Sequence, residues 1–181
     1  MARRTDLSCR AGSPNPAKRA QPAHSDGRKH LRRLDRIFSD LDGPIYFLTC
    51  CVDDRKPVLA CDAAVAVLVA AWETSPDVYG WAVGRYVVMP DHVHFFATSW
   101  REDAKDLSEF IASWKRWTRN RMRKQCGPTF SWQPEFFDHV LRSSESYSQK
   151  WEYVRMNPVR AALVGDADNW PYQGELVDLA W

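Results

Sequence analysis

The spacing of hydrophobic positions separates a polar N-terminal segment from the rest of the chain. Residues 1–28 are mainly Ser, Pro, Gly, Ala and Arg and have almost no large apolar side chains. Such a segment cannot bury enough surface to offset the entropy lost on ordering. Between residues 30 and 41, apolar positions recur at helical spacing. We therefore expect residues 1–42 to form a basic, largely disordered leader that can include a short helix.

From residue 43 onward, runs rich in β-branched and aromatic residues alternate with longer runs of helical period. The runs predict strands at residues 45–52, 78–89, 92–98 and 136–141. They predict helices at residues 60–73, 105–124 and 145–156, with a short helical stretch beginning at Pro158.

The order β-α-β-β-α-β, followed by one more helix, predicts an α+β fold with a ferredoxin-like antiparallel sheet. We expect residues 43–166 to form this domain and residues 167–181 to be an irregular tail. In this arrangement the third strand can lie inside the sheet, with one face packed on helices and the other open.

Two of the five histidines, His92 and His94, lie within one apolar run. In a strand, residues i and i+2 point to the same face, with Cα atoms roughly 6.5–7 Å apart. Such a pair can hold one divalent metal through neutral imidazole nitrogens. Two ligands do not complete a site, and a half-exposed strand that carries two structural histidines explains the pattern as well.

Tyr153 and Asn157 are four residues apart in the last predicted helix. On a helix, this spacing separates their directions by about 40° and their heights by about 6 Å. One face would present a phenol beside an amide oxygen. Alternatively, Tyr153 packs in the core and Asn157, which precedes Pro158, ends the helix.

Within the helix predicted at residues 105–124, the C-terminal half carries six cations and no acid in ten residues. These are Lys115, Arg116, Arg119, Arg121, Arg123 and Lys124. Solvated helix faces usually mix both signs of charge. A single-sign run with Trp114 and Trp117 among it favours binding to the phosphates and bases of nucleic acid. The formal net charge of +2 does not reveal this uneven distribution.

Composition restricts the class of protein further. The 181 residues are 45% hydrophobic and 27% charged, which is ordinary for one globular domain. The longest apolar run is far too short to span a bilayer, and the Arg-rich N-terminus lacks a signal-peptide core. Five cysteines without a C-x-x-C spacing favour free thiols in a reducing compartment. We therefore expect a cytoplasmic location.

Three segments together resemble the REP-associated tyrosine transposases, single-tyrosine HUH enzymes of the IS200-like superfamily. They are YVVMPDHVHFF at residues 86–96, WQPEFFDHVLR at residues 132–142 and EYVRMNPVRAALV at residues 152–164. The resemblance implies that His92, His94 and Asn157 bind Mg²⁺ or Mn²⁺ and that Tyr153 attacks a DNA phosphodiester. His139 matches a family position and either supports the site or contacts DNA, or is structural on the fourth predicted strand. Asp91 either orients His92 as an acceptor or is simply the turn residue after Pro90.

The expected function is cleavage and rejoining of single-stranded or hairpin DNA through a 5′-phosphotyrosine. The cations expected to contact DNA are Lys115, Arg116, Arg119, Arg123, Arg142 and Arg160. One alternative is a domesticated protein that recognises palindromic DNA repeats without mobilising them. A zinc hydrolase that uses the histidine pair is a weaker alternative, because no third His, Cys or acid has a matching spacing. The sequence leaves monomer and homodimer open.

Overall fold

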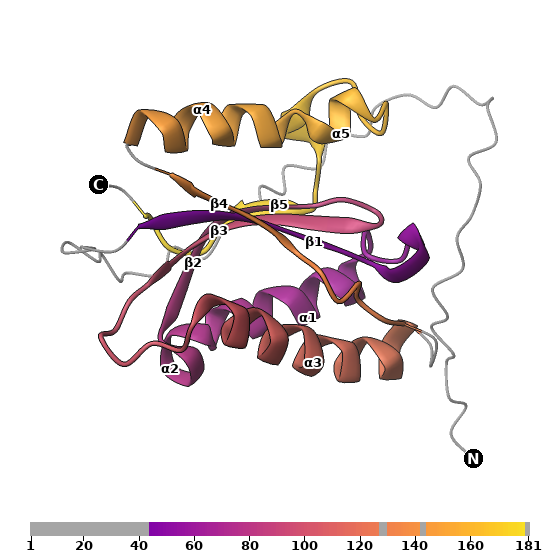
Figure 1. Cartoon of the computed structure of the whole chain (residues 1–181). Helices are drawn as coiled ribbons and strands as arrows, with labels where there is room; N and C mark the ends of the chain where they lie inside the picture. The colour runs from indigo at the N-terminus through magenta and orange to yellow at the C-terminus, as the bar shows by residue number, and fades with distance from the viewer. Residues whose placement is uncertain (1–43, 127–129, 142–143, 180–181) are drawn as a thin grey trace, which may run out of the picture.

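The structure, a computed structural model, describes residues 44–126, 130–141 and 144–179 (Figure 1). The leader expected over residues 1–42 lies outside the described residues. The strands are β1 (Ile45–Cys51), β2 (Trp81–Val88), β3 (His92–Ser99), β4 (Phe137–Leu141) and β5 (Gln173–Glu175). The α-helices are α1 (Asp62–Glu73), α2 (Ser75–Tyr79), α3 (Leu107–Cys126), α4 (Ser144–Arg155) and α5 (Asn157–Arg160). Two short 3₁₀ helices are η1 (Asp53–Arg55) and η2 (Ala167–Asn169).

The five strands form one sheet in the order β4-β1-β3-β2-β5, and every neighbouring pair is antiparallel. The first four strands and the helices α1 and α3 give the predicted β-α-β-β-α-β order. The ferredoxin-like α+β prediction is confirmed. The histidine-bearing strand β3 lies in the middle of the sheet, between β1 and β2.

One face of the sheet is covered by α1 and α3 (Figure 1). Alternate residues of β3, among them Val93 and Phe95, point into this layer and are fully buried. Trp72 from α1 and Trp114 from α3 stack with ring centroids 5.8 Å apart and pack against Phe95. These three rings are among the largest fully buried side chains of the described residues, and their close packing restrains the inner strands.

The opposite face carries the other residues of β3 and is covered in part by α4 (Figure 1). Phe47 and Phe96 pack there with Tyr147 and Val154 of α4, forming a second, smaller core. This face is therefore less open than the sequence indicated. His92 and His94 belong to this face, because they alternate with the buried Val93.

The short helix α2 was not predicted. Pro76 occupies a first-turn position of the short helix α2, where its missing N–H is tolerated, and Gly80 ends the helix at φ 76°. β2 consequently begins only at Trp81. A Cβ at Gly80 would also approach the Cα of Ala104 to 2.7 Å, so both the backbone and the packing require glycine here.

The segment expected to be an irregular tail instead adds the edge strand β5 to the sheet. β5 pairs with β2, and Trp170, Val177 and Leu179 are buried in the second core. Gly84 in β2 allows this packing, because a Cβ there would lie 2.7 Å from the Leu179 side chain. The segment is thus part of the folded domain.

Candidate functional site

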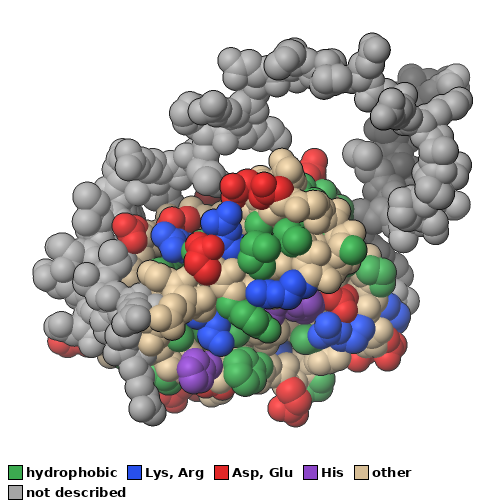
Figure 2. Space-filling model, turned by 90° about the horizontal axis from the view of Figure 1, so that it is seen from above, with side chains coloured by type: hydrophobic (Ala, Val, Ile, Leu, Met, Phe, Trp, Pro, Cys, Tyr) green, Lys and Arg blue, Asp and Glu red, His purple; other side chains and the backbone are tan. Residues whose placement is uncertain are grey.

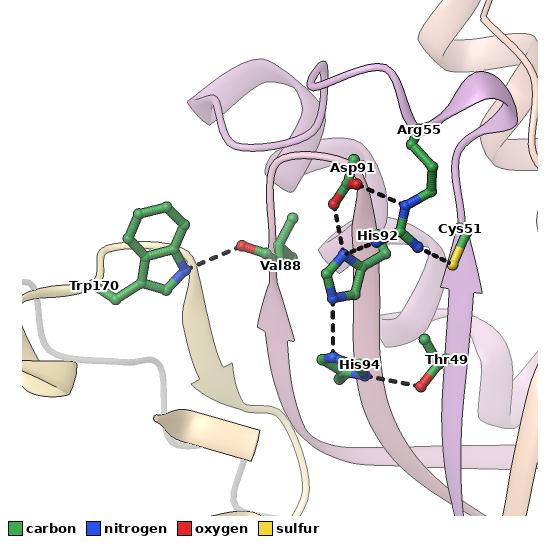
Figure 3. Close-up of polar contacts among 8 residues, drawn as sticks. All are labelled: Thr49, Cys51, Arg55, Val88, Asp91, His92, His94 and Trp170. Carbon is green, nitrogen blue, oxygen red and sulfur yellow. Dashed lines mark hydrogen bonds and ion pairs between the residues drawn. The ribbon is translucent and has the colours of Figure 1, made fainter. Parts of the chain in front are cut away.

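The two histidines lie side by side at the start of β3, where that strand pairs with the end of β1. His94 is opposite Thr49 and His92 is opposite Cys51 in the antiparallel register. The two imidazole Nε2 atoms are 3.1 Å apart. The strand geometry therefore brings the predicted pair together, with the Nε2 atoms of the two rings facing each other at hydrogen-bond distance (Figure 3).

The other ring nitrogens are held by oxygen atoms. His92 Nδ1 lies 2.6 Å from Asp91 Oδ1, and His94 Nδ1 lies 2.8 Å from Thr49 Oγ1. Both arrangements are satisfied when Nδ1–H donates to the oxygen, which leaves the Nε2 lone pair free. Two facing lone pairs at 3.1 Å repel each other unless a proton or a cation lies between them. The Asp91 contact is the orienting role that the sequence suggested for this residue.

The surroundings keep both rings neutral. Burial, together with the nearby charges of His92, Arg55 and Lys150, lowers the pKa of His94 to about 3. Burial also lowers the pKa of His92, against the opposing effect of Asp91. Neutral imidazole is the form that binds metal, so the pair does not need to lose protons at physiological pH.

The spacing of the pair fits a divalent cation. With metal–nitrogen distances of about 2.1 Å, nitrogens 3.1 Å apart subtend an angle of about 95°, close to the 90° of octahedral coordination. Among the residues that the structure describes, no three His, Cys, Asp or Glu side chains are grouped as a metal site. Within the described part of the chain, a third protein ligand would therefore have to be another kind of donor, such as an amide.

Arg55 is a member of the site that the sequence did not reveal. Its Nε lies 2.7 Å from Asp91 Oδ2, and its Nη1 donates to Cys51 Sγ at 2.8 Å (Figure 3). Burial raises the pKa of Asp91, but hydrogen bonds and charges from His92 and Arg55 outweigh this effect, and the net shift is downwards. Arg55 thus keeps Asp91 ionised and aimed at His92.

Tyr153 projects from α4 beside the same face of the sheet, and 60% of its surface is exposed. Lys150 connects it to the histidines: its Nζ lies 5.8 Å from the Tyr153 ring centroid and 5.0 Å from that of Phe47. Phe47 in turn stacks on His94, with ring centroids 5.4 Å apart. Tyr153 and the imidazoles are therefore linked through two intervening side chains.

Asn157 lies at the start of α5, after a break in the helix at Met156. Pro158 supplies no N–H to the preceding turn, which accounts for the break. Arg160 Nη1 donates to Asn157 Oδ1 at 2.8 Å and to the Tyr153 carbonyl at 2.7 Å. The Arg160 guanidinium also lies 4.1 Å from the Tyr153 ring centroid. The structure thus brings Tyr153, Asn157 and Arg160 together, with the amide oxygen of Asn157 on Arg160 rather than on the imidazoles.

The basic helix α3 lies on the opposite face of the sheet from the histidines (Figure 1). Arg116 and Arg123 are exposed, whereas Arg119 is half-buried. The Arg123 Nε donates to the carbonyl of Phe130. Arg142 lies outside the described residues.

Lys115 differs from the other cations of α3 and corrects one expectation. Only 8% of its surface is exposed, and its Nζ donates to the carbonyls of Gln133, Pro134 and Glu135 at 2.7–3.1 Å. An ammonium group has three donors, so none is left for a phosphate. Lys115 positions the segment before β4, where the sequence had suggested a contact with DNA.

His139 lies on β4, directly opposite Phe47 of β1, and is exposed. It is two strands away from β3 and one row further along than His94. It thus lies at the margin of the same face and outside the imidazole pair.

Similar proteins were found by sequence and by structure. A REP-associated tyrosine transposase of Escherichia coli strain K12 is 28% identical over 90 residues, 50% of this chain and 52% of the relative. A Haemophilus influenzae protein, provisionally named a REP-associated tyrosine transposase, is 22% identical over 139 residues, 72% of this chain and 78% of that protein. No family model matches the chain. The chain thus spans about half the length of the first relative and more than two thirds of the second.

A solved structure, that of a REP-associated tyrosine transposase bound to a REP hairpin, matches with a TM-score of 0.59 and 25% identity. The match covers 72% of this chain and 76% of the solved one. The chain is thus similar in sequence to two proteins named as transposases, and in fold to a solved one. The particular proteins that it resembles are REP-associated tyrosine transposases. Among the described residues, no helix is both long and apolar enough to cross a membrane.

Proposed function

We propose that the protein cleaves and rejoins single-stranded or hairpin DNA through a covalent 5′-phosphotyrosine on Tyr153. His92, His94 and Asn157 would hold Mg²⁺ or Mn²⁺. The observation that carries this proposal is the 3.1 Å separation of two Nε2 atoms on rings whose Nδ1 atoms are each held by a side-chain oxygen. The solved relative bound to a REP hairpin supports a hairpin as the substrate.

In the proposed reaction, the Tyr153 oxygen attacks the phosphorus of one phosphodiester and loses its proton to solvent. The bond from phosphorus to the 3′ oxygen breaks, and that oxygen gains a proton to become a free 3′-hydroxyl. When bound, the metal polarises the phosphate and stabilises the charge that develops on the leaving oxygen. Because the phosphotyrosine conserves the phosphodiester bond energy, a 3′-hydroxyl can attack it and rejoin the strands without a nucleotide cofactor.

Arg160 would couple the binding of a DNA phosphate to the binding of the metal. Its guanidinium holds Asn157 Oδ1 and covers the Tyr153 ring in the structure. A phosphate accepts stronger, charge-assisted hydrogen bonds than an amide oxygen does. A DNA phosphate would therefore draw Arg160 away, which frees the Asn157 oxygen as the third protein ligand and uncovers Tyr153.

On α3, the exposed Arg116 and Arg123 and the half-buried Arg119 would hold the phosphate backbone beyond the cleavage site. They lie across the sheet from the imidazoles. A hairpin can contact both α3 and the imidazole pair only if its stem passes around the edge of the sheet. We assign this helix to substrate affinity and assign the chemistry to the α4 face.

The test is covalent capture of DNA. The protein is incubated with 3′-labelled hairpin and single-stranded oligonucleotides and Mn²⁺, then denatured and separated by electrophoresis. We expect a denaturation-resistant adduct in the wild type that is absent in Tyr153→Phe and in the presence of EDTA, while Tyr153→Phe still binds DNA. If the wild type binds hairpins tightly but forms no adduct with any divalent metal, the protein is a DNA-binding module and the proposal is wrong.

A further inference from the structure

The edge strand β4 presents an aromatic side chain on the same face of the sheet as the imidazole pair. Phe137 is 57% exposed, although it lies within a regular strand. We propose that Phe137 is a stacking platform for an unpaired nucleobase beside the cleaved phosphodiester, and that it thereby selects the position that is cut. The proposal rests on the proposed function, because it assumes that DNA lies on this face.

The register of the sheet places Phe137 in line with the histidines. Phe137 is opposite Thr49 of β1, and Thr49 is opposite His94 of β3. Neighbouring strands lie about 4.8 Å apart, so Phe137 and His94 are separated by about 10 Å across the sheet. Successive phosphates of one strand advance by about 3.4 Å in duplex DNA and by more when the strand is extended. A base on Phe137 therefore belongs to a nucleotide within about three positions of a phosphate at the imidazoles.

The ring is supported on its inner side and accessible on its outer side. Phe47 contacts it edge-on, with ring centroids 6.3 Å apart, and Phe47 itself stacks on His94. Residues 137–140 of β4 are all exposed, and β4 has no strand on its outer side within the described sheet. A planar group can thus approach Phe137 from the open edge without displacing a buried side chain.

The charges around the ring favour a nucleic acid over another protein as the occupant. Lys150 lies 5.0 Å from the Phe47 centroid, and the guanidinium of Arg160 covers Tyr153 on the same side of α4. Figure 2 looks down on this side and shows Lys and Arg side chains among hydrophobic and histidine side chains, with Asp and Glu side chains also present. Cations interleaved with exposed aromatic rings are the arrangement by which proteins bind single strands, with bases stacked on the rings.

The strand also has room to continue beyond Phe137. A surface hollow of about 250 Å³ is lined by His139, Val140, Leu141 and Ser146, further along β4. His139 points to the same face as Phe137, because the two residues are two apart in the strand. A single strand that crosses Phe137 can therefore pass over His139 at the margin of the sheet.

The test asks whether removing the Phe137 ring and removing one base affect the same binding interaction. Binding is measured in the Tyr153→Phe background, which prevents cleavage, with hairpins that carry an abasic site at each of three positions on either side of the cut. We expect Phe137→Ala to weaken binding of the intact hairpin between about 5-fold and 100-fold. One abasic position should weaken binding to the parent protein by a similar factor, yet cause no further loss in Phe137→Ala. Phe137→Trp should retain binding within about 3-fold.

Val78→Ala is the matched control, because Val78 is also an exposed apolar residue, 58% accessible, but lies on α2 away from this face. The DNA affinity of Val78→Ala should equal that of the parent protein. Val78→Ala and Phe137→Ala should both keep the melting temperature of the parent protein. If the losses of binding free energy caused by Phe137→Ala and by each abasic site simply add at every position, the stacking proposal is wrong. This holds even when the covalent adduct of Tyr153 forms. If the losses are coupled but wild type never forms an adduct, the platform stands and the cleavage reaction is what fails. Failure of every hairpin to bind would overturn both.

Discussion

At the scale of single residues, the hydrogen bond between His92 and Asp91 decides which imidazole nitrogen is available to a cation. Asp91 is held in turn by Arg55, so a half-exposed carboxylate is fixed by two cationic or polar partners. Such outer contacts orient metal-binding histidines and raise their basicity. The arrangement makes the affinity for metal sensitive to a residue that does not touch the metal.

We therefore predict that Asp91→Asn lowers the affinity for Mn²⁺ by about 10-fold to 100-fold, measured by isothermal titration calorimetry. The amide keeps an acceptor for His92 but loses the charge that Arg55 also holds. Asp54→Asn is the matched control, because Asp54 is an exposed aspartate of the neighbouring η1 turn whose ion pair is with Lys56 rather than with Arg55 or a histidine. Equal affinities for all three proteins would show that Asp91 does not tune the pair.

The adjacent thiols Cys50 and Cys51 provide a second prediction at this scale. Burial raises the pKa of Cys50 to about 12, whereas Cys51 is half-exposed and accepts a hydrogen bond from Arg55. Because the thiolate is the reactive form, native protein at pH 8 should be alkylated at Cys51 and protected at Cys50. Peptide mapping by mass spectrometry after brief iodoacetamide treatment distinguishes the two. Labelling of Cys50 at a rate comparable to that of Cys51 would contradict the register of β1, because that register buries the Cys50 side chain.

The sequence contained the histidine pair but not its surroundings. A period of two in β3 is enough to place His92 and His94 on one face. Arg55 could not be found in this way, because its approach to Asp91 depends on a turn in which Asp54 and Arg55 both have φ of 53°. It also depends on the pairing of β1 with β3 across a large sequence separation. Sequence periodicity carries neither kind of information.

At the scale of elements, α3 combines two kinds of basic residue that look alike in the sequence. Lys115 faces inward and holds three carbonyls of the segment that leads into β4, whereas Arg116 faces solvent. A run of cations predicts a basic helix, but only packing shows which of its members are free to bind a ligand. This is why the expected role of Lys115 needed correction.

We predict that Lys115→Met lowers the free energy of unfolding by about 2 kcal/mol, because it removes the charged donor that three backbone carbonyls share. Arg116→Met should change it by less than about 0.5 kcal/mol and should weaken DNA binding instead. Urea denaturation followed by tryptophan fluorescence measures the first effect, and fluorescence anisotropy with a labelled hairpin measures the second. Equal stabilities of the two variants would refute the structural role of Lys115.

The longer elements were predictable because their hydrophobic periods are long and unbroken. β1, β3, α1 and α3 begin and end within a few residues of the predicted positions. The short β5 was missed, because three residues such as Gln173–Glu175 become a strand only when β2 offers its edge. The break between α4 and α5 follows from Pro158 and was foreseen.

At the scale of the whole molecule, the sheet separates the cations of α3 from the candidate catalytic face (Figure 1). Affinity for the backbone and chemistry at the phosphate are thus assigned to different faces. Each phosphate neutralised by an Arg releases counterions, which steepens the dependence of binding on salt.

This separation predicts that Arg116→Ala and Arg121→Ala together reduce the slope of log affinity against log salt by roughly 1.5 for a long hairpin. The same double variant should bind a short single strand, which reaches only the α4 face, as tightly as the wild type does. Anisotropy titrations at several salt concentrations measure both slopes. An equal loss for the short and the long DNA would mean that both faces contact the same few nucleotides.

The most direct test of the account is the identity of the residue that becomes linked to DNA. Wild-type protein is incubated with Mn²⁺ and a hairpin oligonucleotide, digested with protease and nuclease, and analysed by tandem mass spectrometry. The account predicts one modified peptide, in which the side chain of Tyr153 carries a nucleotide through its 5′-phosphate, while the released DNA ends in a 3′-hydroxyl. A nucleotide attached to any other residue, or a complete absence of linkage in protein that binds the hairpin, would contradict it.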